Sequence, residues 1–133
     1  PVAGIPELRT ALAKKLKTEN SLDYEAADIV LANGAKQAVA NAILSIIDAG
    51  DEVIMLAPFW LAYETTVRFA GGTPVVLHSS ISENYKVPAV RIAAAVTDRT
   101  KLLIVNSPCN PSGALWSRVE LEAISAIVLD HPA

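Results

Sequence analysis

The stretch DEVIMLAPFWLAYETTVRFAGGTPVVLHS, residues 51–79, decides the fold class of this protein. Its two ends, residues 51–57 and 73–79, are short and almost wholly apolar. The part between them has helical character and stops at two glycines. Short apolar runs of this kind are typical of strands buried on both faces, as in a parallel sheet. The stretch therefore predicts a strand, a helix and a second, parallel strand.

The same alternation continues outward in both directions. Two more apolar runs, residues 28–33 and 101–106, predict a first and a fourth strand. Helical patterns are found before, between and after the strands, at residues 5–19, 36–50, 61–72, 88–96 and 117–128. The last of them begins with the capping-box spacing of Ser117 and Glu120. We therefore expect an α/β fold, a three-layer sandwich in which helices cover both faces of a mainly parallel sheet.

Composition places the chain among globular proteins and argues against several functional classes. Its 133 residues suit one domain or a piece of a larger one, and its 52% hydrophobic and 19% charged residues argue against disorder. The net charge of −3 argues against a nucleic-acid partner. No apolar run approaches the roughly 20 residues that span a membrane. The single cysteine, Cys109, cannot form an internal disulfide, which favours a cytoplasmic protein.

Three of the four predicted strands end in unusual sequence. The segments are NGAKQA (33–38) after the first strand, APFWLAY (57–63) after the second and NSPCNPSG (106–113) after the fourth. Ligands of open parallel sheets bind outside the carboxyl ends of the strands. These three segments are therefore candidate binding loops.

Each of these loops has a functional interpretation and a structural alternative. Gly34 leads directly into a helix whose first-turn N–H groups attract an anion such as phosphate, although an ordinary turn has the same sequence features. Trp60 can either cover a flat ring or pack in the core. Asn110 is flanked by prolines that restrict the backbone, which favours an aimed carboxamide over a plain turn.

In this order and spacing, the segments resemble the class I aminotransferases of the aspartate aminotransferase kind, which are fold-type I pyridoxal-phosphate enzymes. The resemblance is carried by AGIPELRTALAKKL (3–16), by the segment from LANGAKQ to GGTPV (31–75) and by VNSPCNPSG (105–113). The last is similar to the family signature N-x-P-x-N-P-[ST]-G. Ser112 stands where threonine is common in the family and keeps the hydroxyl. The resemblance extends over the whole chain.

The resemblance implies that five residues bind the cofactor, pyridoxal 5'-phosphate. Gly34, Ala35 and Lys36 match the loop that holds the cofactor phosphate. Trp60 matches the aromatic residue that stacks on the pyridine ring. Asn110 matches the asparagine that hydrogen-bonds the 3-oxygen of the cofactor. In the family the residues at the last two positions also contact the substrate. All five residues are therefore expected to converge on one cofactor.

The resemblance also implies the reaction, transfer of an amino group between an amino acid, of the aspartate type, and a 2-oxo acid. The family's Schiff-base lysine, aspartate–tyrosine motif and carboxylate-binding arginine correspond to positions after Ala133. Residues 1–133 are therefore expected to be a partial cofactor-binding large domain that lacks the small domain, contains no catalytic residue and no metal site, and is inactive alone. The family pattern implies a homodimer, and cis peptide bonds at Ala57–Pro58 and Asn110–Pro111.

The strand order of the family adds an expectation about the sheet. The strands at residues 51–57, 73–79 and 101–106 are expected to pair with one another. The strand at residues 28–33 is expected to lie apart from them, because in the family the strands between come from later in the sequence.

Three other interpretations stay open at the level of sequence. A different fold-type I enzyme, such as a lyase or synthase that acts on amino acids, shares the motifs of this region. A truncated, non-catalytic fragment is a second possibility. A nucleotide-binding module ranks below both, because the glycine fingerprints of such modules are absent from the sequence.

Overall fold

The structure, a computed structural model, describes residues 2–131. Its α-helices are α1 (Pro6–Asn20), α2 (Ala35–Ile46), α3 (Ala62–Phe69), α4 (Ala89–Ala95) and α5 (Arg118–Asp130). Short 3-10 helices are η1 (Ala26–Asp28) and η2 (Ile81–Glu83), and the strands are β1 (Glu52–Ala57), β2 (Thr73–His78) and β3 (Thr100–Ile104). Among residues 2–131, no helix combines the length and the apolar character that crossing a bilayer requires. The chain divides into two compact units, one that ends at Asn41 and one that begins at Ala42.

In the first unit, Arg9 joins α1 to residues 27–29 of the segment that follows it. Arg9 Nε donates to the carbonyl oxygen of Ile29 at 2.8 Å, and Arg9 Nη2 donates to that of Ala27 at 3.3 Å. The helix begins at Pro6, a first-turn position where the missing N–H of proline has no consequence. It ends at Asn20, and the next residue, Ser21, takes a left-handed conformation. The predicted first helix is confirmed.

The predicted strand at residues 28–33 is wrong. Ile29 has an extended backbone, and the Leu31 N–H donates to the Ala3 carbonyl at 3.0 Å, but no strand forms within this segment. A strand needs a partner that continues a ladder of hydrogen bonds. Here the Ile29 carbonyl is instead satisfied by the side chain of Arg9. The apolar pattern therefore predicted an extended segment correctly, but the assignment of this segment to a sheet was wrong.

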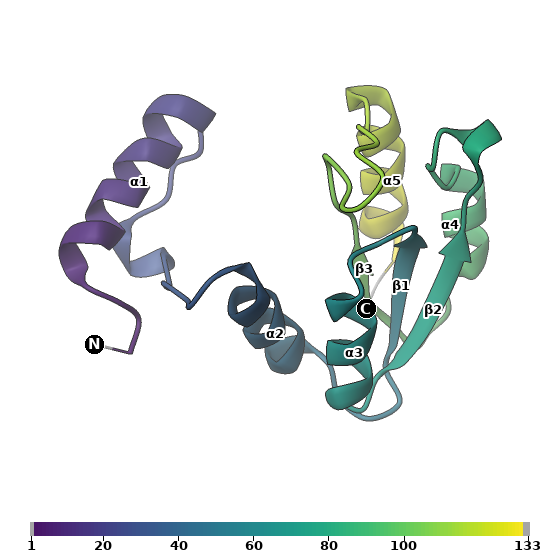
Figure 1. Cartoon of the computed structure of the whole chain (residues 1–133), viewed down its shortest axis with the longest axis horizontal. Helices are drawn as coiled ribbons and strands as arrows, with labels where there is room; N and C mark the ends of the chain where they lie inside the picture. Colours follow the sequence, from purple (N-terminus) through teal and green to yellow (C-terminus); the bar gives the residue numbers. More distant parts are fainter. Residues whose placement is uncertain (1, 132–133) are drawn as a thin grey trace. The chain divides into compact units, whose positions relative to one another are not determined.

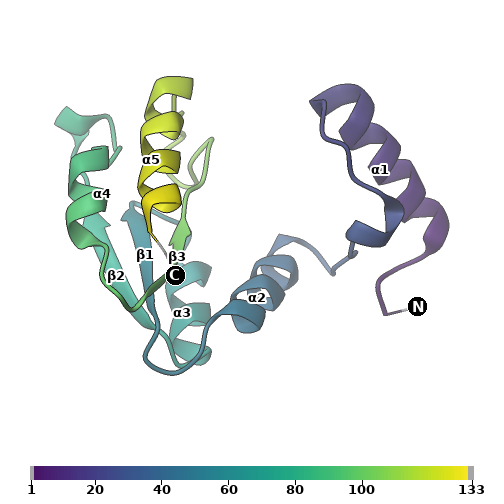
Figure 2. The ribbon, with the colours of Figure 1, turned by 180° about the vertical axis from the view of Figure 1, so that it is seen from behind.

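In the second unit, the three strands form a parallel sheet in the order β2-β1-β3. Met55 lies opposite Val76 of β2 and Ile104 of β3, so β1 is central. Helix α3 lies on one face of the sheet, and α4 and α5 lie on the other (Figures 1 and 2). The three-layer architecture, the parallel sheet and the pairing of these three strands are confirmed.

The core follows from the central position of β1. Val53, Ile54 and Met55 are fully buried, although successive side chains of a strand point to opposite faces. On the side of α4 and α5, the buried cluster consists of Val87, Ile92 and Ile124. Partly buried residues of all three strands pack against this cluster, namely Leu56, Leu77 and Leu103. Both faces of the central strand are therefore covered.

Helix α3 returns to the sheet through a close turn at Gly72. A Cβ atom at this position would lie 2.7 Å from Ile47 Cγ2 and 3.2 Å from Val67 Cγ1. Both neighbours are buried, so neither has room to move. Glycine is therefore required at this position, because the backbone passes too close to Ile47 and Val67 to leave room for a side chain. The chain enters β2 directly after it.

Predicted helices are confirmed in position, with one end displaced. Helix α2 ends at Ile46 and not at Gly50, where the sequence predicted its end. The carboxylate of Asp51 accepts the N–H of Asp48 at 2.8 Å, and the N–H of Asp51 donates to the Asp48 carbonyl at 3.2 Å. These bonds close a turn, so the chain has left the helix before it reaches the glycine.

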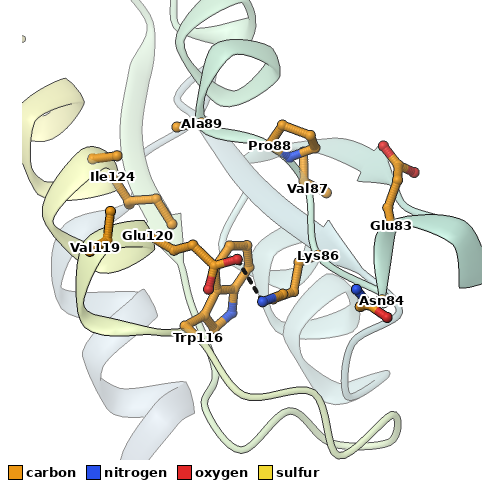
Figure 3. Close-up of a pocket in the computed structure, with 11 residues that line it drawn as sticks. Glu83, Asn84, Lys86, Val87, Pro88, Ala89, Trp116, Val119, Glu120 and Ile124 are labelled. Carbon is orange, nitrogen blue, oxygen red and sulfur yellow. Dashed lines mark ion pairs between the residues drawn. The ribbon is translucent and has the colours of Figure 1, made fainter.

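A pocket of about 410 Å³ lies between the segment before α4 and the amino end of α5 (Figure 3). At its edge Lys86 Nζ lies 2.6 Å from Glu120 Oε1 and 6.0 Å from the ring centre of Trp116.

The other carboxylate oxygen of Glu120 accepts the Ser117 N–H at 2.7 Å, and the Ser117 hydroxyl accepts the Glu120 N–H at 3.3 Å. The predicted capping box is confirmed. The Lys86 ammonium and the Ser117 N–H lower the pKa of Glu120 to about 2.

The low pKa of Glu120 predicts a pH-dependent contribution to stability. Because folding favours the ionised form, the contribution is complete above the ordinary carboxyl pKa and is lost as the pH falls toward the folded value of about 2. We expect Glu120→Gln to lower the melting temperature at pH 7, and the difference from the parent to shrink as the pH falls toward 3. Circular dichroism melts across this range measure the difference.

Glu122 provides a matched control on the same helix. It forms an exposed pair with Arg118 at 2.8 Å, and such surface pairs contribute little to stability. Glu122→Gln should therefore change the melting temperature slightly at every pH. A difference between Glu120→Gln and the parent that is the same at pH 7 and pH 3 would contradict the role assigned to the Glu120 charge.

Candidate functional site

Two of the candidate binding loops follow neighbouring strands of the sheet. Strand β1 ends at Ala57, and the loop after it carries Trp60; β3 ends at Ile104, and the loop after it carries Asn110. Because the strands are parallel and adjacent, both loops leave the sheet at its carboxyl edge. The topology therefore places these two predicted site residues at the same edge.

A hydrogen bond joins the two loops directly. Cys109 Sγ donates to the carbonyl oxygen of Pro58 at 3.2 Å, across 51 positions of sequence. Cys109 immediately precedes Asn110, and Pro58 lies two residues before Trp60. The structure therefore brings the Trp60 loop and the Asn110 loop into contact through their neighbours.

The prolines of these loops adopt the cis form. The peptide bonds Ala57–Pro58 and Asn110–Pro111 are both cis, which confirms the prediction for each. Ser107–Pro108 is also cis, and the sequence did not indicate it.

The indole of Trp60 packs against a residue that was not among the predicted site residues. The Tyr63 ring lies edge-on to it, with ring centres 5.6 Å apart and planes at 83°. Tyr63 is buried on α3, and burial raises the pKa of its phenol, an effect to which Cys109 adds. No pattern in the sequence singles out Tyr63; the turn in which its N–H donates to the Trp60 carbonyl at 3.0 Å brings the two side chains together. Phe59 also lies near Tyr63, with the centres of their two rings 6.5 Å apart.

The backbone of the Asn110 loop is held from within. The Asn110 N–H donates to Asn106 Oδ1 at 2.8 Å, the Gly113 N–H to the Cys109 carbonyl at 2.7 Å, and the Cys109 N–H to the Ala114 carbonyl at 2.9 Å. The Asn110 side chain is exposed, and within residues 2–131 its carboxamide makes no hydrogen bond. Its donors and its acceptor are therefore presented to the outside of the loop on a fixed backbone.

The third candidate loop lies in the first unit, at the amino end of α2. Gly34 has φ +82°, and a Cβ atom there would have no neighbour within 4 Å. Gln37 Oε1 accepts the Asn33 N–H at 2.5 Å and ties the loop to the helix. The following residues, from Ala35, form the first turn of α2, whose amino end is the positive end of the helix dipole. The convergence of Gly34, Ala35 and Lys36 with Trp60 and Asn110 on one ligand stays a prediction.

A pocket of about 620 Å³ opens beside the two joined loops. It includes the last residues of β1 and β2 and three neighbours of Trp60; its lining residues are Ala57, Pro58, Phe59, Leu61, Glu64, Val76, His78 and Pro111. Its volume lies within the range of small-molecule sites. The pocket therefore adds a hollow at the carboxyl edge, lined by neighbours of the predicted residues and not by Trp60 or Asn110 themselves.

Comparison with known proteins gives a consistent result over the whole chain. The family model described as aminotransferase class I and II matches residues 1–133. The aspartate/prephenate aminotransferase of Thermus thermophilus is 44% identical over 131 residues, which are 98% of this chain and 34% of the relative. A solved structure of aspartate aminotransferase from Thermus thermophilus with maleate matches this chain with a TM-score of 0.94 at 44% identity. The match covers 99% of this chain and 35% of the chain of that structure.

A more distant structure has the same architecture. The aromatic aminotransferase of Pyrococcus horikoshii has a TM-score of 0.94 at 35% identity, and the match covers 98% of this chain and 35% of that protein. The chain thus spans about a third of the length of the relatives that it matches.

Proposed function

Because the chain belongs to the aminotransferase class I and II family, we propose that the whole protein transfers an amino group between an amino acid and a 2-oxo acid with pyridoxal 5'-phosphate. Residues 1–133 form part of its cofactor-binding large domain, in keeping with the share of each relative that they span. The amino acid is of the aspartate type, and the names of the Thermus thermophilus relatives support this choice.

The residues of this chain fit the cofactor by their chemistry. A flat pyridine ring needs an aromatic surface and a polar group at its rim, and Trp60 and Asn110 offer these on joined loops. A phosphate is attracted to the amino end of a helix, and α2 begins directly after Gly34. When bound, the cofactor supplies an electron sink for the carbon that loses its proton.

Each residue then has a distinct task. Gly34, Ala35 and Lys36 form the loop that holds the phosphate, at the amino end of α2, which is the positive end of the helix dipole. The Trp60 indole covers one face of the pyridine ring and excludes water from it. The Asn110 carboxamide donates to the 3-oxygen of the cofactor and contacts the substrate, so it orients both.

One contact carries the proposal, the hydrogen bond from Cys109 Sγ to the Pro58 carbonyl at 3.2 Å. Without it, Trp60 and Asn110 would lie on loops that share only a sheet edge. With it, the residue two positions before Trp60 is hydrogen-bonded to the residue directly before Asn110. This supports a single ligand that both side chains contact.

Two further inferences concern the assembly and the compartment. We infer a homodimer, as implied for aminotransferases of this kind. We also infer a cytoplasmic location, which the free thiol of Cys109 supports because disulfides rarely form in a reducing compartment.

The role of Trp60 can be tested by fluorescence in the full-length protein. Adding pyridoxal phosphate is expected to quench tryptophan emission, because the cofactor ring lies against the indole. Trp60→Phe should remove much of this quenching and weaken cofactor binding by no more than about threefold, since the smaller phenyl ring retains part of an aromatic contact that contributes ~0.5–1.5 kcal/mol.

The second tryptophan of the chain supplies the control. Trp116 follows β3 and packs against the buried cluster with Val87 and Ile124, away from the proposed ring contact. Trp116→Phe should therefore retain the quenching and the affinity of the parent. Equal loss of quenching in the two variants would refute the placement of Trp60 on the cofactor.

A further inference from the structure

We propose that Cys109 is a positioning residue of the active site. The hydrogen bond from its thiol to the Pro58 carbonyl sets the position of the Trp60 indole relative to the Asn110 carboxamide. This inference rests on the proposed function, because the bond can position the two side chains for binding only if both of them contact one cofactor. It assigns no reaction step to the sulfur.

The first support is that Cys109 is itself immobilised. Its N–H donates to the Ala114 carbonyl at 2.9 Å, and its carbonyl accepts the Gly113 N–H at 2.7 Å. These two bonds close the loop onto itself. Because the backbone N–H and carbonyl of Cys109 are both used within the loop, the S–H group is its remaining polar group. Cys109 is half-buried, and its S–H group donates to a carbonyl outside the loop.

The second support is the way in which the Trp60 loop is anchored. The Ala57 carbonyl accepts both the Ser79 hydroxyl at 2.6 Å and the Ser79 N–H at 3.1 Å. The next carbonyl along the chain, that of Pro58, accepts the Cys109 thiol. Consecutive peptide groups are therefore held from the end of β2 and from the loop after β3. Loss of the thiol releases the second of these anchors, which is the one nearer to Trp60.

The third support is the short path from the bond to the two functional groups. Asn110 directly follows the donor residue, and Trp60 lies two residues after the acceptor. A shift at the bond is therefore passed to both groups with little chain between to absorb it. Displacements of about 1 Å at positioning groups can reduce rates by up to about 100-fold, so a partial shift should have a measurable effect.

The experiment compares Cys109→Ala with Cys109→Ser in the full-length holoenzyme. Alanine removes the donor, whereas serine keeps an O–H that can bond the same carbonyl. We expect Cys109→Ala to lower kcat/KM about three- to tenfold and to change the visible circular dichroism of the bound cofactor, which depends on the orientation of its ring. Cys109→Ser should restore both quantities to within about twofold of the parent, since it retains the hydrogen bond.

A second measurement does not require that the alanine variant folds. The S–H stretching band of a cysteine shifts to lower wavenumber when the thiol donates a hydrogen bond. The band of Cys109, identified by its loss in the Cys109→Ser difference spectrum, is expected to lie lower in the native parent than the band of a simple alkanethiol in an apolar solvent, where the thiol donates no hydrogen bond. An unshifted band would overturn the proposal, as would equal kinetics and equal dichroism in the alanine and serine variants.

Failure of this inference can be separated from failure of the proposed function. If the parent full-length protein neither binds pyridoxal phosphate nor transfers an amino group to a 2-oxo acid, the proposed function itself is wrong. If Trp60→Phe loses the quenching while Cys109→Ala keeps parental kinetics and dichroism, only the role of Cys109 is wrong.

Discussion

Replacing Asn110 by alanine in the full-length protein is expected to lower kcat/KM for the amino-acid substrate about 100-fold, since one or two charge-assisted hydrogen bonds are lost. The Asn110 carboxamide is exposed, and no hydrogen bond within residues 2–131 occupies it. Its backbone is held by Asn106, whose side chain accepts the Asn110 N–H at 2.8 Å. Alanine keeps this backbone bond. The substitution therefore removes the aimed group without releasing the loop.

The measurement is steady-state kinetics combined with a melting curve. The melting temperature should change little, because the removed atoms are exposed and have no partner in the fold. Asn41→Ala is the matched control: Asn41 is exposed on α2, outside the candidate loops, and should leave kcat/KM within about twofold of the parent, since such surface changes have small effects. A value of kcat/KM for Asn110→Ala that equals the control would refute the assignment of Asn110.

Replacing Ile92 by alanine is expected to reduce the free energy of unfolding by about 2–5 kcal/mol, the range for removing a large aliphatic side chain from a packed core. Ile92 lies on α4, is fully buried and belongs to the cluster with Val87 and Ile124. This cluster holds α4 and α5 on the same face of the sheet. The cavity left by alanine removes contacts from several neighbours at once, and interiors have little capacity to close such a gap.

Urea denaturation followed by Trp116 fluorescence measures this change, because Trp116 packs against the same cluster. Val90→Ala is the control on the same helix. The Val90 side chain is 74% exposed, so its removal should change the free energy of unfolding by less than about 0.5 kcal/mol. Equal effects at the two positions would mean that the α4–sheet interface is not packed as described.

Most of the secondary structure was predictable because its signals are local. The apolar runs at residues 51–57, 73–79 and 101–106 correspond to the three strands of the described sheet. The capping box of Ser117 and Glu120 is a bond pattern within four residues, and it is present as predicted. The run at residues 28–33 has the same apolar character and forms no strand. Apolar character reports burial, whereas a strand also requires a partner.

The candidate site was predictable in its residues and not in its contacts. Trp60 and Asn110 were identified from unusual sequence at strand ends, and the structure places their loops together at the carboxyl edge. Tyr63 was missed, because a tyrosine at the start of a helix is unremarkable until its ring is seen edge-on to Trp60. Cys109 was considered only as a single cysteine that cannot form an internal disulfide, and its hydrogen-bond partner is 51 positions away.

From residue 51 onward, the sequence by itself determined the order of the helices and strands, the parallel direction of the strands and the residue types at each strand end, because periodicity, capping and proline act over a few neighbouring residues. Only the tertiary structure decided that the thiol of Cys109 meets the carbonyl of Pro58, and that Arg9 takes the Ile29 carbonyl that a strand would have used. Such contacts join residues far apart in the chain. They exist only after the elements have packed, and no local pattern specifies which distant group will lie within hydrogen-bonding distance.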